Sequence, residues 1–323
     1  MHTFSQLTQM VEQALSQLAL PASPNLLYAP MRYALQSGGK RIRPVMTLMC
    51  AEIFIQNIDN EIVNIALAVE LFHTFTLIHD DIMDHADLRR GVPTVVKKWD
   101  TNVAILSGDG MLIEAYRLLC GAPNAAEVLK VFNRAAIEVC EGQQLDVDFE
   151  LLPTISLEQY YEMVGRKTAV LLAAAASIGA VAAGAPAADV EHLRSFAYKL
   201  GLAFQVQDDY LDCYSNAEEF GKATGGDIIE QKKTFLFVST TAVLKEKELA
   251  DFICLMQNTT LERTEKITQV KAVYAKVGVE KMVHNEVEKL FAEAMQHLAE
   301  VNVADDKKTE IKNLALAIMQ RKK

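Results

Sequence analysis

The sequence predicts an all-α fold, a single domain built as a bundle of roughly ten to thirteen helices. Apolar residues recur every three to four positions along most of the chain, which is the spacing of one helix face. Short alternating runs of β-branched residues, the signal of strands, are nearly absent. No low-complexity linker divides the 323 residues, so we expect one domain over 1–323. Two of the helical runs are Leu67, Leu71, Phe75 and Ile78, and Leu193, Phe196, Leu200 and Phe204.

Helix ends are indicated by caps and by glycine and proline. Ser156, with Gln159 three positions later, has the pattern of a capped helix start. The stretch 168–188 is the most apolar of the chain and is rich in Ala and Gly. We interpret it as a packed core helix, because a membrane span would need about 20 strongly apolar residues. The expected breaks lie at Pro21, Pro24, Gly38, Gly39, Pro44, Gly91, Pro93, Gly121, Pro123, Pro153, Gly184, Pro186, Gly225 and Gly226.

Composition narrows the class of protein. Half of the residues are apolar (50%), enough for a sizeable core, and the net charge of −10 argues against general nucleic-acid binding. The five cysteines are odd in number and form no CxxC pair, which indicates free thiols in a reducing compartment. The first residues show no basic segment followed by an apolar one, so no signal peptide is expected. Together these features predict a cytoplasmic protein without an integral membrane segment.

Two Asp-Asp-x-x-Asp clusters are the strongest functional signal. On a helix the first and last aspartates of such a cluster lie about 40° apart, and the second lies about 100° from the first. Carboxylates grouped in this way are hard oxygen ligands that suit Mg²⁺, which prefers to share its shell with phosphate oxygens. Two such faces opposite each other would hold a diphosphate through several ions. The clusters are Asp80, Asp81 and Asp84, and Asp208, Asp209 and Asp212.

The alternative interpretation of each cluster is a solvated acidic helix face. Against it, Ile78 precedes the first cluster and Phe204 the second, so both clusters emerge from apolar helices. Buried like charges are costly unless cations neutralise them, and we therefore favour metal binding. Asp146 and Asp148 lie only two positions apart and do not share a helix face, so we expect a structural or surface role for them.

Basic segments that could bind phosphates accompany both clusters. Arginine suits bidentate phosphate recognition, and lysine acts as a point charge. One segment alone would be a weak signal, because cations near helix ends are often solvated caps. His73 lies two turns before Asp80, and its spacing alone leaves open whether it packs in the core or donates to a phosphate. The segments are 38–44, 87–91, 165–168, 221–222 and 232–234.

Six motifs follow one another along the chain: GGKRIRP at 38–44, LIHDDIMD at 77–84, RRGVPT at 89–94, GRKT at 165–168, FQVQDDYLD at 204–212 and GKATGGD at 221–227. In these motifs and their order the chain resembles the trans-type short-chain polyprenyl diphosphate synthases, the farnesyl and geranylgeranyl diphosphate synthase family. The resemblance covers about residues 33–236, close to two thirds of the chain.

The resemblance implies an all-α bundle around a central cavity, usually paired as a homodimer. It implies that three Mg²⁺ are bound by Asp80, Asp81, Asp84, Asp208 and Asp212. The allylic diphosphate would be contacted by Arg89, Lys167, Thr168, Gln205, Lys222 and Lys232. Isopentenyl diphosphate would be bound by Lys40, Arg43, His73 and Arg90. The residues implied in catalysis itself are Asp80, Asp81, Asp84, Lys167 and Asp208.

The implied reaction needs no nucleophilic triad. Metal ions and cationic side chains stabilise the charge that builds on the departing diphosphate. The double bond of isopentenyl diphosphate attacks the allylic carbocation, and a proton is then lost, with the released diphosphate as its expected acceptor. An apolar cavity excludes the water that would otherwise trap the cation.

Three positions depart from the family pattern. Gln231 and Leu236 stand where many members have Gly and Pro, and Val96 stands where many have His. These departures bear on the shape of the loops for the second substrate and not on the activity.

The length of the product is expected to depend on the residues one to two turns before Asp80, which would form the floor of the cavity. They are Phe75 and Thr76, with Phe72 a turn below. From the pattern alone, Phe75 could equally be an ordinary core residue. In the family, an aromatic residue five positions before the first Asp, without an insertion in the cluster, resembles the enzymes that make C20 chains. We predict C20, with C15 as the alternative.

Other functions are compatible with a helical bundle of this kind. A class I terpene cyclase would need one Asp-rich cluster and an Asn/Ser/Glu metal motif, and would need neither GGKRIRP nor the second Asp cluster. A noncatalytic subunit of a heteromeric prenyl synthase would tend to lose an Asp cluster or the cationic loops. A generic metal-binding protein would not need the cations. Since both clusters and all the basic segments are present, we favour the enzyme.

Overall fold

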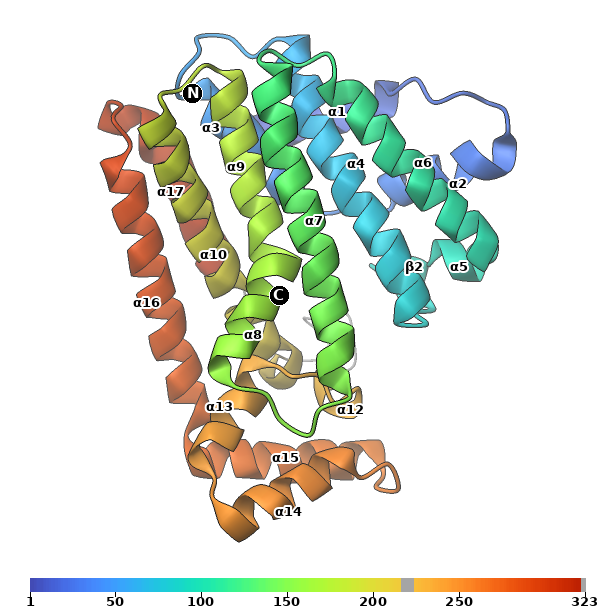
Figure 1. Cartoon of the computed structure of the whole chain (residues 1–323), viewed down its shortest axis with the longest axis vertical. Helices are drawn as coiled ribbons and strands as arrows, with labels where there is room; N and C mark the ends of the chain where they lie inside the picture. The colour runs from blue at the N-terminus through green and yellow to red at the C-terminus, as the bar shows by residue number, and fades with distance from the viewer. Residues whose placement is uncertain (216–223, 321–323) are drawn as a thin grey trace. The chain divides into compact units, whose positions relative to one another are not determined.

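The computed structural model describes residues 1–215 and 224–320, and it confirms the prediction of an all-α fold (Figure 1). Helices make up 77% of the structure, and the described part of the chain has 15 of them when the continuous run Leu157–Ala182, which contains α8, η1 and α9, is counted as one. The expected ten to thirteen helices are exceeded by α5 and α12, which have only four residues each. The central cavity and the single domain over 1–323 stay predictions.

The elements run as follows along the chain: α1 Phe4–Gln17, α2 Asn25–Gln36, α3 Ile42–Glu52, α4 Asn60–Met83, β1 Leu88–Arg89, β2 Val92–Pro93, α5 Val95–Lys98, α6 Thr101–Leu119, α7 Ala125–Glu150, α8 Leu157–Val164, the π-helical turn η1 Gly165–Ala169, α9 Val170–Ala182, α10 Ala187–Tyr214, α12 Gly226–Ile229, α13 Phe235–Val243, α14 Glu246–Gln257, α15 Arg263–Val277, α16 Val279–Glu300 and α17 Asp305–Met319.

Contacts divide the chain into two compact units, and each unit is assembled from three separate segments. Unit 1 consists of Met1–Asn133, Ala174–Arg194 and Val301–Lys312. Unit 2 consists of Arg134–Ala173, Ser195–Glu300 and Asn313–Lys323, as far as these segments are described. Each unit contains one of the two Asp clusters, and each is described by itself below.

Unit 1 is organised around α4, which packs against α6 along its length (Figure 1). Asp59 starts α4 by accepting a hydrogen bond from the backbone N of Ile62 at 2.9 Å. The apolar residues of α4 point in nearly all directions and are buried on most sides, as in a central helix. A Cβ on Gly179 would overlap with the carbonyl of Thr47, so a glycine is needed where α9 meets α3.

A short hairpin follows α4, although the sequence indicated almost no strands. β1 and β2 pair antiparallel, and the turn between them places Arg90 and Gly91 at φ of 54° and 78°. Two positive φ values in a two-residue loop are typical of a tight hairpin turn. The hairpin is fixed to α2 by the Tyr33 hydroxyl, which donates to the Pro93 carbonyl at 2.7 Å.

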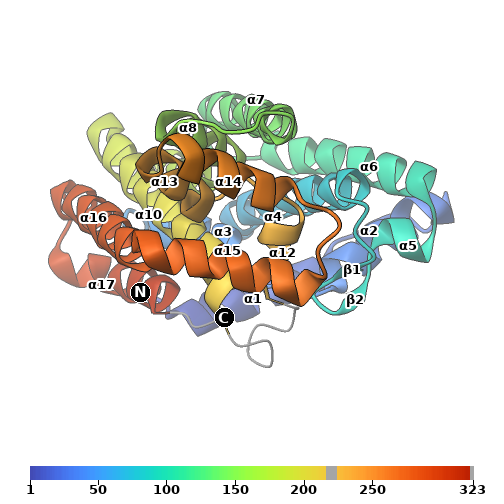
Figure 2. The same cartoon turned by 90° about the horizontal axis from the view of Figure 1, so that it is seen from below.

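Unit 2 contains α13, α15 and α16, with α8 and α14 packed against them. Figure 2 shows α14 and α15 beside each other. Its core is aromatic, since the Phe237 ring lies 5.7 Å from that of Phe252, which lies 6.0 Å from that of Tyr274. The predicted helix start at Ser156 is confirmed, because Ser156 and Gln159 form a reciprocal capping box at the beginning of α8.

Two long apolar helical runs of the sequence are largely buried in the structure. The helical runs Asn60–Met83 and Leu157–Ala182 are long and apolar enough to cross a bilayer, yet 61% and 78% of their most apolar windows are buried. Core helices pass the same test, so this is weak evidence for a membrane span.

Pro44, expected at a break, instead lies in the first turn of α3, where its missing N–H is not required.

Candidate active site

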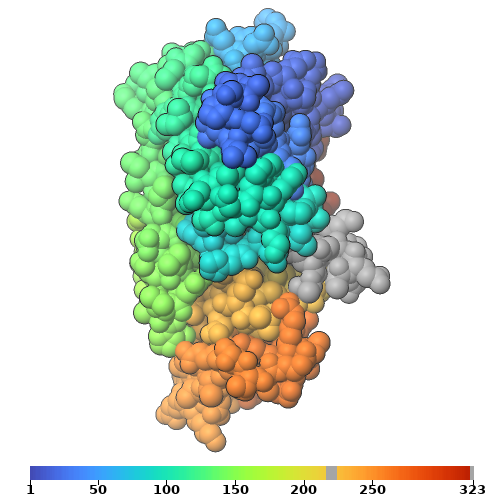
Figure 3. Space-filling view, turned by 90° about the vertical axis from the view of Figure 1, so that its right-hand side faces the viewer, coloured from blue at the N-terminus to red at the C-terminus, as the bar shows by residue number. Residues whose placement is uncertain are grey.

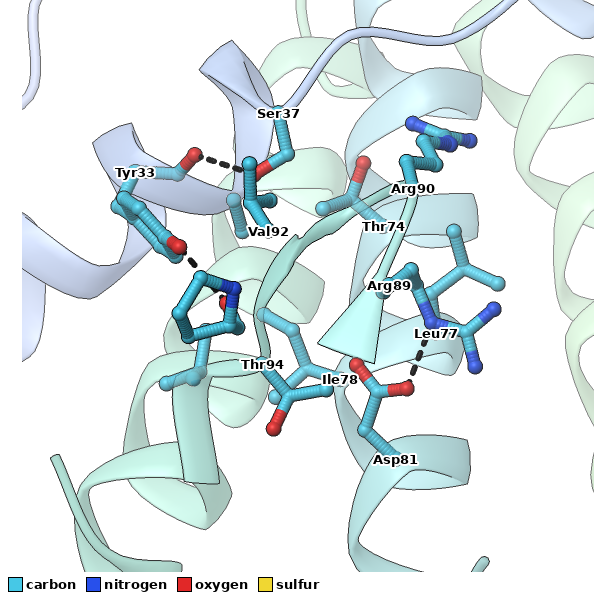
Figure 4. Close-up of a pocket in the computed structure, with 13 residues that line it drawn as sticks. Tyr33, Ser37, Thr74, Leu77, Ile78, Asp81, Arg89, Arg90, Val92 and Thr94 are labelled. Carbon is cyan, nitrogen blue, oxygen red and sulfur yellow. Dashed lines mark hydrogen bonds and ion pairs between the residues drawn. The ribbon is translucent and has the colours of Figure 1, made fainter. Parts of the chain in front are cut away.

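The first Asp cluster lies at the C-terminal end of α4 in unit 1. Asp80 is half-buried, and Asp84 is exposed at the C-cap of the helix. Asp81 is buried, and its Oδ1 accepts a hydrogen bond from Arg89 Nε at 2.6 Å (Figure 4). The roughly 100° offset expected from helix geometry thus turns Asp81 toward the hairpin.

A small cavity lies beneath the hairpin, lined by side chains from α2, α4 and both strands (Figure 4). Its volume is about 30 Å³, which leaves room for only one or two water molecules. A diphosphate does not fit in it. The pair formed by Asp81 and Arg89 at its edge therefore links the hairpin to α4, and so fixes the position of Arg89 beside the Asp cluster.

The predicted residues for isopentenyl diphosphate meet in unit 1. His73 Nε2 lies 3.1 Å from Arg43 Nη1, and since a guanidinium can only donate, this nitrogen accepts and the imidazole is neutral. Burial and the charges of Arg43 and Arg90 agree with this, because they lower the pKa of His73 well below its usual value. Arg90 donates to the carbonyl of Gly38, and Lys40 is exposed.

The charged form of Arg43 is disfavoured by its surroundings. Burial lowers the pKa of its guanidinium to about 10, and the nearby charge of Arg90 acts in the same direction. Its Nε is buried and has no hydrogen-bond partner among the residues that the structure describes. A buried donor of this kind suits an anion-binding site.

The second glycine of the GGKRIRP segment, Gly39, leaves room for the side chain of Arg90. Gly39 has φ of 141°, and a Cβ there would lie 2.7 Å from Arg90 Nη1. The absence of a side chain thus lets the Arg90 guanidinium pass over the loop and reach the carbonyl of Gly38.

The second cation of that segment, Arg41, is a structural residue. Its Nη1 lies 2.5 Å from Glu70 Oε1, and its Nε lies 2.7 Å from Glu12 Oε1. Glu70 is buried on α4, and burial raises its pKa, while Arg41, Arg43 and Arg90 oppose that shift. Sequence reasoning missed Glu70, which balances the charge of the arginines; its place one turn before Thr74 on an apolar helix gave no signal.

The second Asp cluster lies near the C-terminal end of α10 in unit 2, and its middle member is a core residue. Asp209 is buried and accepts three hydrogen bonds of 2.8 Å, from Tyr160 Oη, the Phe235 backbone N and Gln205 Nε2. Burial raises the pKa of Asp209 to about 7, although the three donors favour the charged form. Asp209 thus links α10 to α8 and to the first turn of α13.

Asp208 and Asp212 lie half-buried beside a fourth carboxylate that the sequence had shown only as part of a motif. Asp212 Oδ2 accepts from the backbone N of Asp227 at 3.0 Å. Burial, followed by the charges of Asp212, Asp209 and Asp208, raises the pKa of Asp227 well above its usual value. Negative charge so concentrated fits divalent cations, which would neutralise it.

The described carboxylates do not form a complete metal site by themselves. Across residues 1–215 and 224–320, no group of three or more His, Cys, Asp or Glu side chains is arranged as a complete metal site. This is compatible with Mg²⁺, which is usually held by one or two carboxylates together with waters and phosphate oxygens.

The GRKT segment forms the π-helical turn η1, which carries Lys167 and Thr168. Such turns widen a helix and are frequent at functional sites. The Thr168 hydroxyl donates to Gln205 Oε1 at 3.0 Å, and Gln205 Nε2 donates to Asp209. The buried carboxylate thereby sets the orientation of the Gln205 amide.

The remaining predicted contacts of the allylic diphosphate are lysines. Lys232 lies 2.7 Å from Glu150, and Lys167 lies 2.5 Å from Asp146. Lys222 lies outside the described residues. Gln231, where many family members have Gly, has φ of 58°, a backbone region that favours glycine.

The predicted floor residues lie on α4 in unit 1. The Phe75 ring lies 5.5 Å from that of Phe72 and 4.7 Å from that of His79. Phe72 is fully buried and packs on Phe132 at 5.1 Å, whereas Phe75 and Thr76 are half-buried. Phe75 therefore lies between the buried ring of Phe72 and the half-buried ring of His79, and its role in chain length stays a prediction.

A family model, two relatives and a solved structure all match this chain to prenyl diphosphate synthases. The family model described as polyprenyl synthetase matches residues 24–277. The geranylfarnesyl diphosphate synthase of Natronomonas pharaonis is 41% identical over 247 residues, which cover 71% of this chain and 72% of that protein. The geranylgeranyl diphosphate synthase of Methanosarcina mazei is 40% identical over 259 residues, 79% of this chain and 78% of that protein. A crystal structure of a geranylgeranyl pyrophosphate synthase matches with a TM-score of 0.94 and 40% identity over 100% of both chains.

Proposed function

The chain belongs to the polyprenyl synthetase family and is a trans-prenyltransferase. We propose that it requires Mg²⁺ and condenses isopentenyl diphosphate with an allylic diphosphate. The observation that carries this proposal is the combination of two carboxylate clusters with two separate sets of cations. One set, Arg43 and Arg90, surrounds neutral His73 in unit 1. The other, Lys167 and Lys232, accompanies the carboxylates of unit 2. Two anionic substrates need two such sets.

The roles of the side chains follow from their chemistry. Bound Mg²⁺ would neutralise the diphosphate as it leaves the allylic carbon, with Asp80, Asp84, Asp208 and Asp212 as ligands, Asp81 as a further ligand, and three ions as the expected number. Lys167 and Lys232 would bind the same diphosphate as point charges, and Arg89 would bind it with two N–H groups. Thr168 and Gln205, joined by a hydrogen bond, would hold the remaining oxygens.

The second substrate would be held by a rigid site. Arg43 has a buried N–H without a partner in the described part of the chain, which a phosphate oxygen would satisfy. His73 stays neutral at physiological pH and would donate through Nδ1, because Nε2 accepts from Arg43. Lys40 and Arg90 would complete the set. The double bond of this substrate attacks the allylic cation, and the released diphosphate takes the proton.

A C20 product is the further proposal, with C15 as the alternative. It rests on Phe75, which lies five positions before Asp80, and on the small neighbour Thr76. The relatives support a short chain but carry two different product names, so the name of a relative does not decide the length.

A homodimer is proposed from an exposed apolar stripe on α6. Leu106 is 60% exposed and Ile113 67% exposed, and residues seven positions apart share a helix face. Figure 3 shows the region of α5 and α6 at the surface, in blue-green. A second copy that presents the same stripe would bury both, as in a two-fold symmetric interface.

A cytoplasmic location is also a proposal. It rests on the cysteine thiols: Cys50 and Cys213 are buried and free, and Cys120, Cys140 and Cys254 are exposed and free. Exposed free thiols are typical of a reducing compartment.

The function can be tested with the single purified chain. We expect Mg²⁺-dependent release of diphosphate from isopentenyl and farnesyl diphosphates together, with a C20 product by chromatography and no release in EDTA. Asp80→Asn and Asp208→Asn should each lower kcat by at least about 100-fold, because each removes a metal ligand. Cyclised hydrocarbons from the allylic substrate alone would instead indicate a terpene cyclase. Turnover only after a second protein is added would indicate a subunit of a heteromeric enzyme.

A further inference from the structure

One face of α7 in unit 2 carries three residues spaced by four: Gly142, Asp146 and Glu150. Residues at this spacing lie above one another along a helix. A Cβ on Gly142 would overlap with the backbone N of Lys167, so the π-helical turn η1 rests directly on α7 at this point. The contact at Gly142 thus fixes the position of the Lys167 backbone along α7, and so its distance from Asp146 and Glu150.

Asp146 lies close to two of the lysines expected to bind the allylic diphosphate. Its Oδ2 is 2.5 Å from Lys167 Nζ and 4.0 Å from Lys232 Nζ. Glu150 also contacts Lys232, with Oε1 2.7 Å from Nζ. The side chain of Asp146 is only 13% exposed, so solvent weakens these interactions little.

Two ammonium groups this close to one another repel unless an anion lies between them. In the protein without substrate, that anion is Asp146. Lysine side chains are long and flexible. Without Asp146, Lys232 would keep its contact with Glu150, whereas Lys167 would lose the carboxylate that holds it toward Lys232. The carboxylate therefore keeps Lys167 and Lys232 at a spacing that the oxygens of one diphosphate can bridge.

We infer that Asp146 is a positioning residue, which holds Lys167 and Lys232 as a pair for the allylic diphosphate and, with Gly142 and Glu150, makes this face of α7 part of the active site. The inference rests on the proposed function. It refines the expectation of a structural role for Asp146, and it separates Asp146 from Asp148, which is exposed and accepts only a hydrogen bond from Gln144 at 2.8 Å in the described part of the chain.

Charge alone would predict the opposite effect. A carboxylate beside an anion site repels the anion, so its removal should strengthen diphosphate binding if the lysines stay in place. If the carboxylate positions the lysines, its removal should weaken binding. The sign of the change therefore distinguishes the two accounts.

The test compares Asp146→Asn with Asp148→Asn in the full-length protein. We measure the dissociation constant of inorganic diphosphate at saturating Mg²⁺, together with kcat and the KM for isopentenyl diphosphate. For Asp146→Asn we expect diphosphate to bind about tenfold more weakly and kcat to fall by at least as much, while the KM for isopentenyl diphosphate changes by less than about twofold. Asp148→Asn should match the wild type.

A double-mutant cycle shows whether Asp146 acts through the lysine. In a Lys167→Gln background, Asp146→Asn should lose most of its effect on kcat, because the positioned group is gone. Should Asp146→Asn fail to fold, Asp146→Glu retains the charge and shifts the carboxylate by one methylene. It should weaken diphosphate binding about threefold, less than the removal of the charge would.

Three results would overturn the inference: tighter diphosphate binding by Asp146→Asn, identical values for the Asp146 and Asp148 variants, or a full effect of Asp146→Asn in the Lys167→Gln background. A raised Mg²⁺ requirement with unchanged diphosphate affinity at saturating Mg²⁺ would also contradict it, because Asp146 would then be a metal ligand. Diphosphate binding needs no turnover, so a wild-type protein without prenyltransferase activity would refute the proposed function and leave this comparison intact.

Discussion

At the scale of single residues, Asp81 and Asp209, the second aspartates of the two Asp clusters, are more deeply buried than the aspartates around them. Asp81 pairs with Arg89, and Asp209 accepts three hydrogen bonds in the core of unit 2. In both clusters the second aspartate faces protein, while the first and last are half-buried or exposed. Helix geometry explains the offset, since the second residue points about 100° from the first.

How much of the site could be predicted from the sequence also becomes clear at this scale. The Asp clusters and the cations were found because their residue types and spacing are rare by chance. Glu70, Tyr160 and Asp227 were not assigned, because single polar residues acquire their meaning from what the fold brings near them. Tyr160 and Asp209 are 49 residues apart and share one hydrogen bond.

Phe75→Ala tests the predicted floor of the cavity. The half-buried ring of Phe75 lies between the rings of Phe72 and His79. Its removal should open space beside Thr76 and lengthen the main product by at least one isoprene unit, as seen by chromatography. Phe54→Ala, which truncates a half-buried phenylalanine of the same unit outside α4, is the control. An unchanged chain length in the Phe75 variant would mean that this residue is ordinary core.

At the scale of elements, the π-helical turn η1 could not be predicted from the sequence. The apolar, Ala-rich composition of 168–188 predicted a packed core helix there, and a single widened turn changes such a composition very little. The structure ends that helix at Ala182, and α10 begins at Ala187, so the breaks expected at Gly184 and Pro186 are confirmed. The glycines around the turn are more informative. Gly142 lies on one side of it, and Gly201 lies on the other, where a Cβ would be 2.8 Å from Ala169 Cα. Two helices thus approach the turn closely enough to fix its backbone.

Gly142→Ala should therefore disturb both stability and binding. The added methyl group would overlap with the Lys167 backbone and force the turn away from α7, with a loss of about 1–3 kcal/mol in the free energy of unfolding. Diphosphate affinity should fall as well, because Lys167 and Thr168 move with the turn. Gly121→Ala is the matched control, since the nearest atom to its Cβ would be 3.7 Å away. Equal melting temperatures and affinities for the two variants would contradict the packing argument.

At the scale of the whole molecule, the fold class was predictable and the division into units was not. Helical periodicity and the lack of strand signals specify an all-α protein. The two units, by contrast, are each assembled from three segments distant in sequence. Such an arrangement leaves no linker or change in composition for sequence reasoning to detect.

The proposed dimer is a property of the whole molecule and can be tested in solution. Ile113→Asp introduces a charge in the apolar stripe of α6 and should weaken dimerisation by about tenfold or more, as measured by sedimentation at several concentrations. Leu151→Asp is the control, because Leu151 lies in unit 2 and is 85% exposed. If neither variant changes the sedimentation coefficient, or if both do so equally, the stripe on α6 is not the interface.

The buried guanidinium of Arg43 has a consequence for how such a chain evolves. An N–H held out of water with no partner among the residues that the structure describes, beside a second arginine, raises the free energy of the folded protein. Selection for heat resistance alone would replace it with an apolar side chain of similar volume. Its retention is expected only where recognition of an anion outweighs stability. Substitutions at this position that make the protein more robust should then make it a poorer enzyme, a conflict common at functional sites.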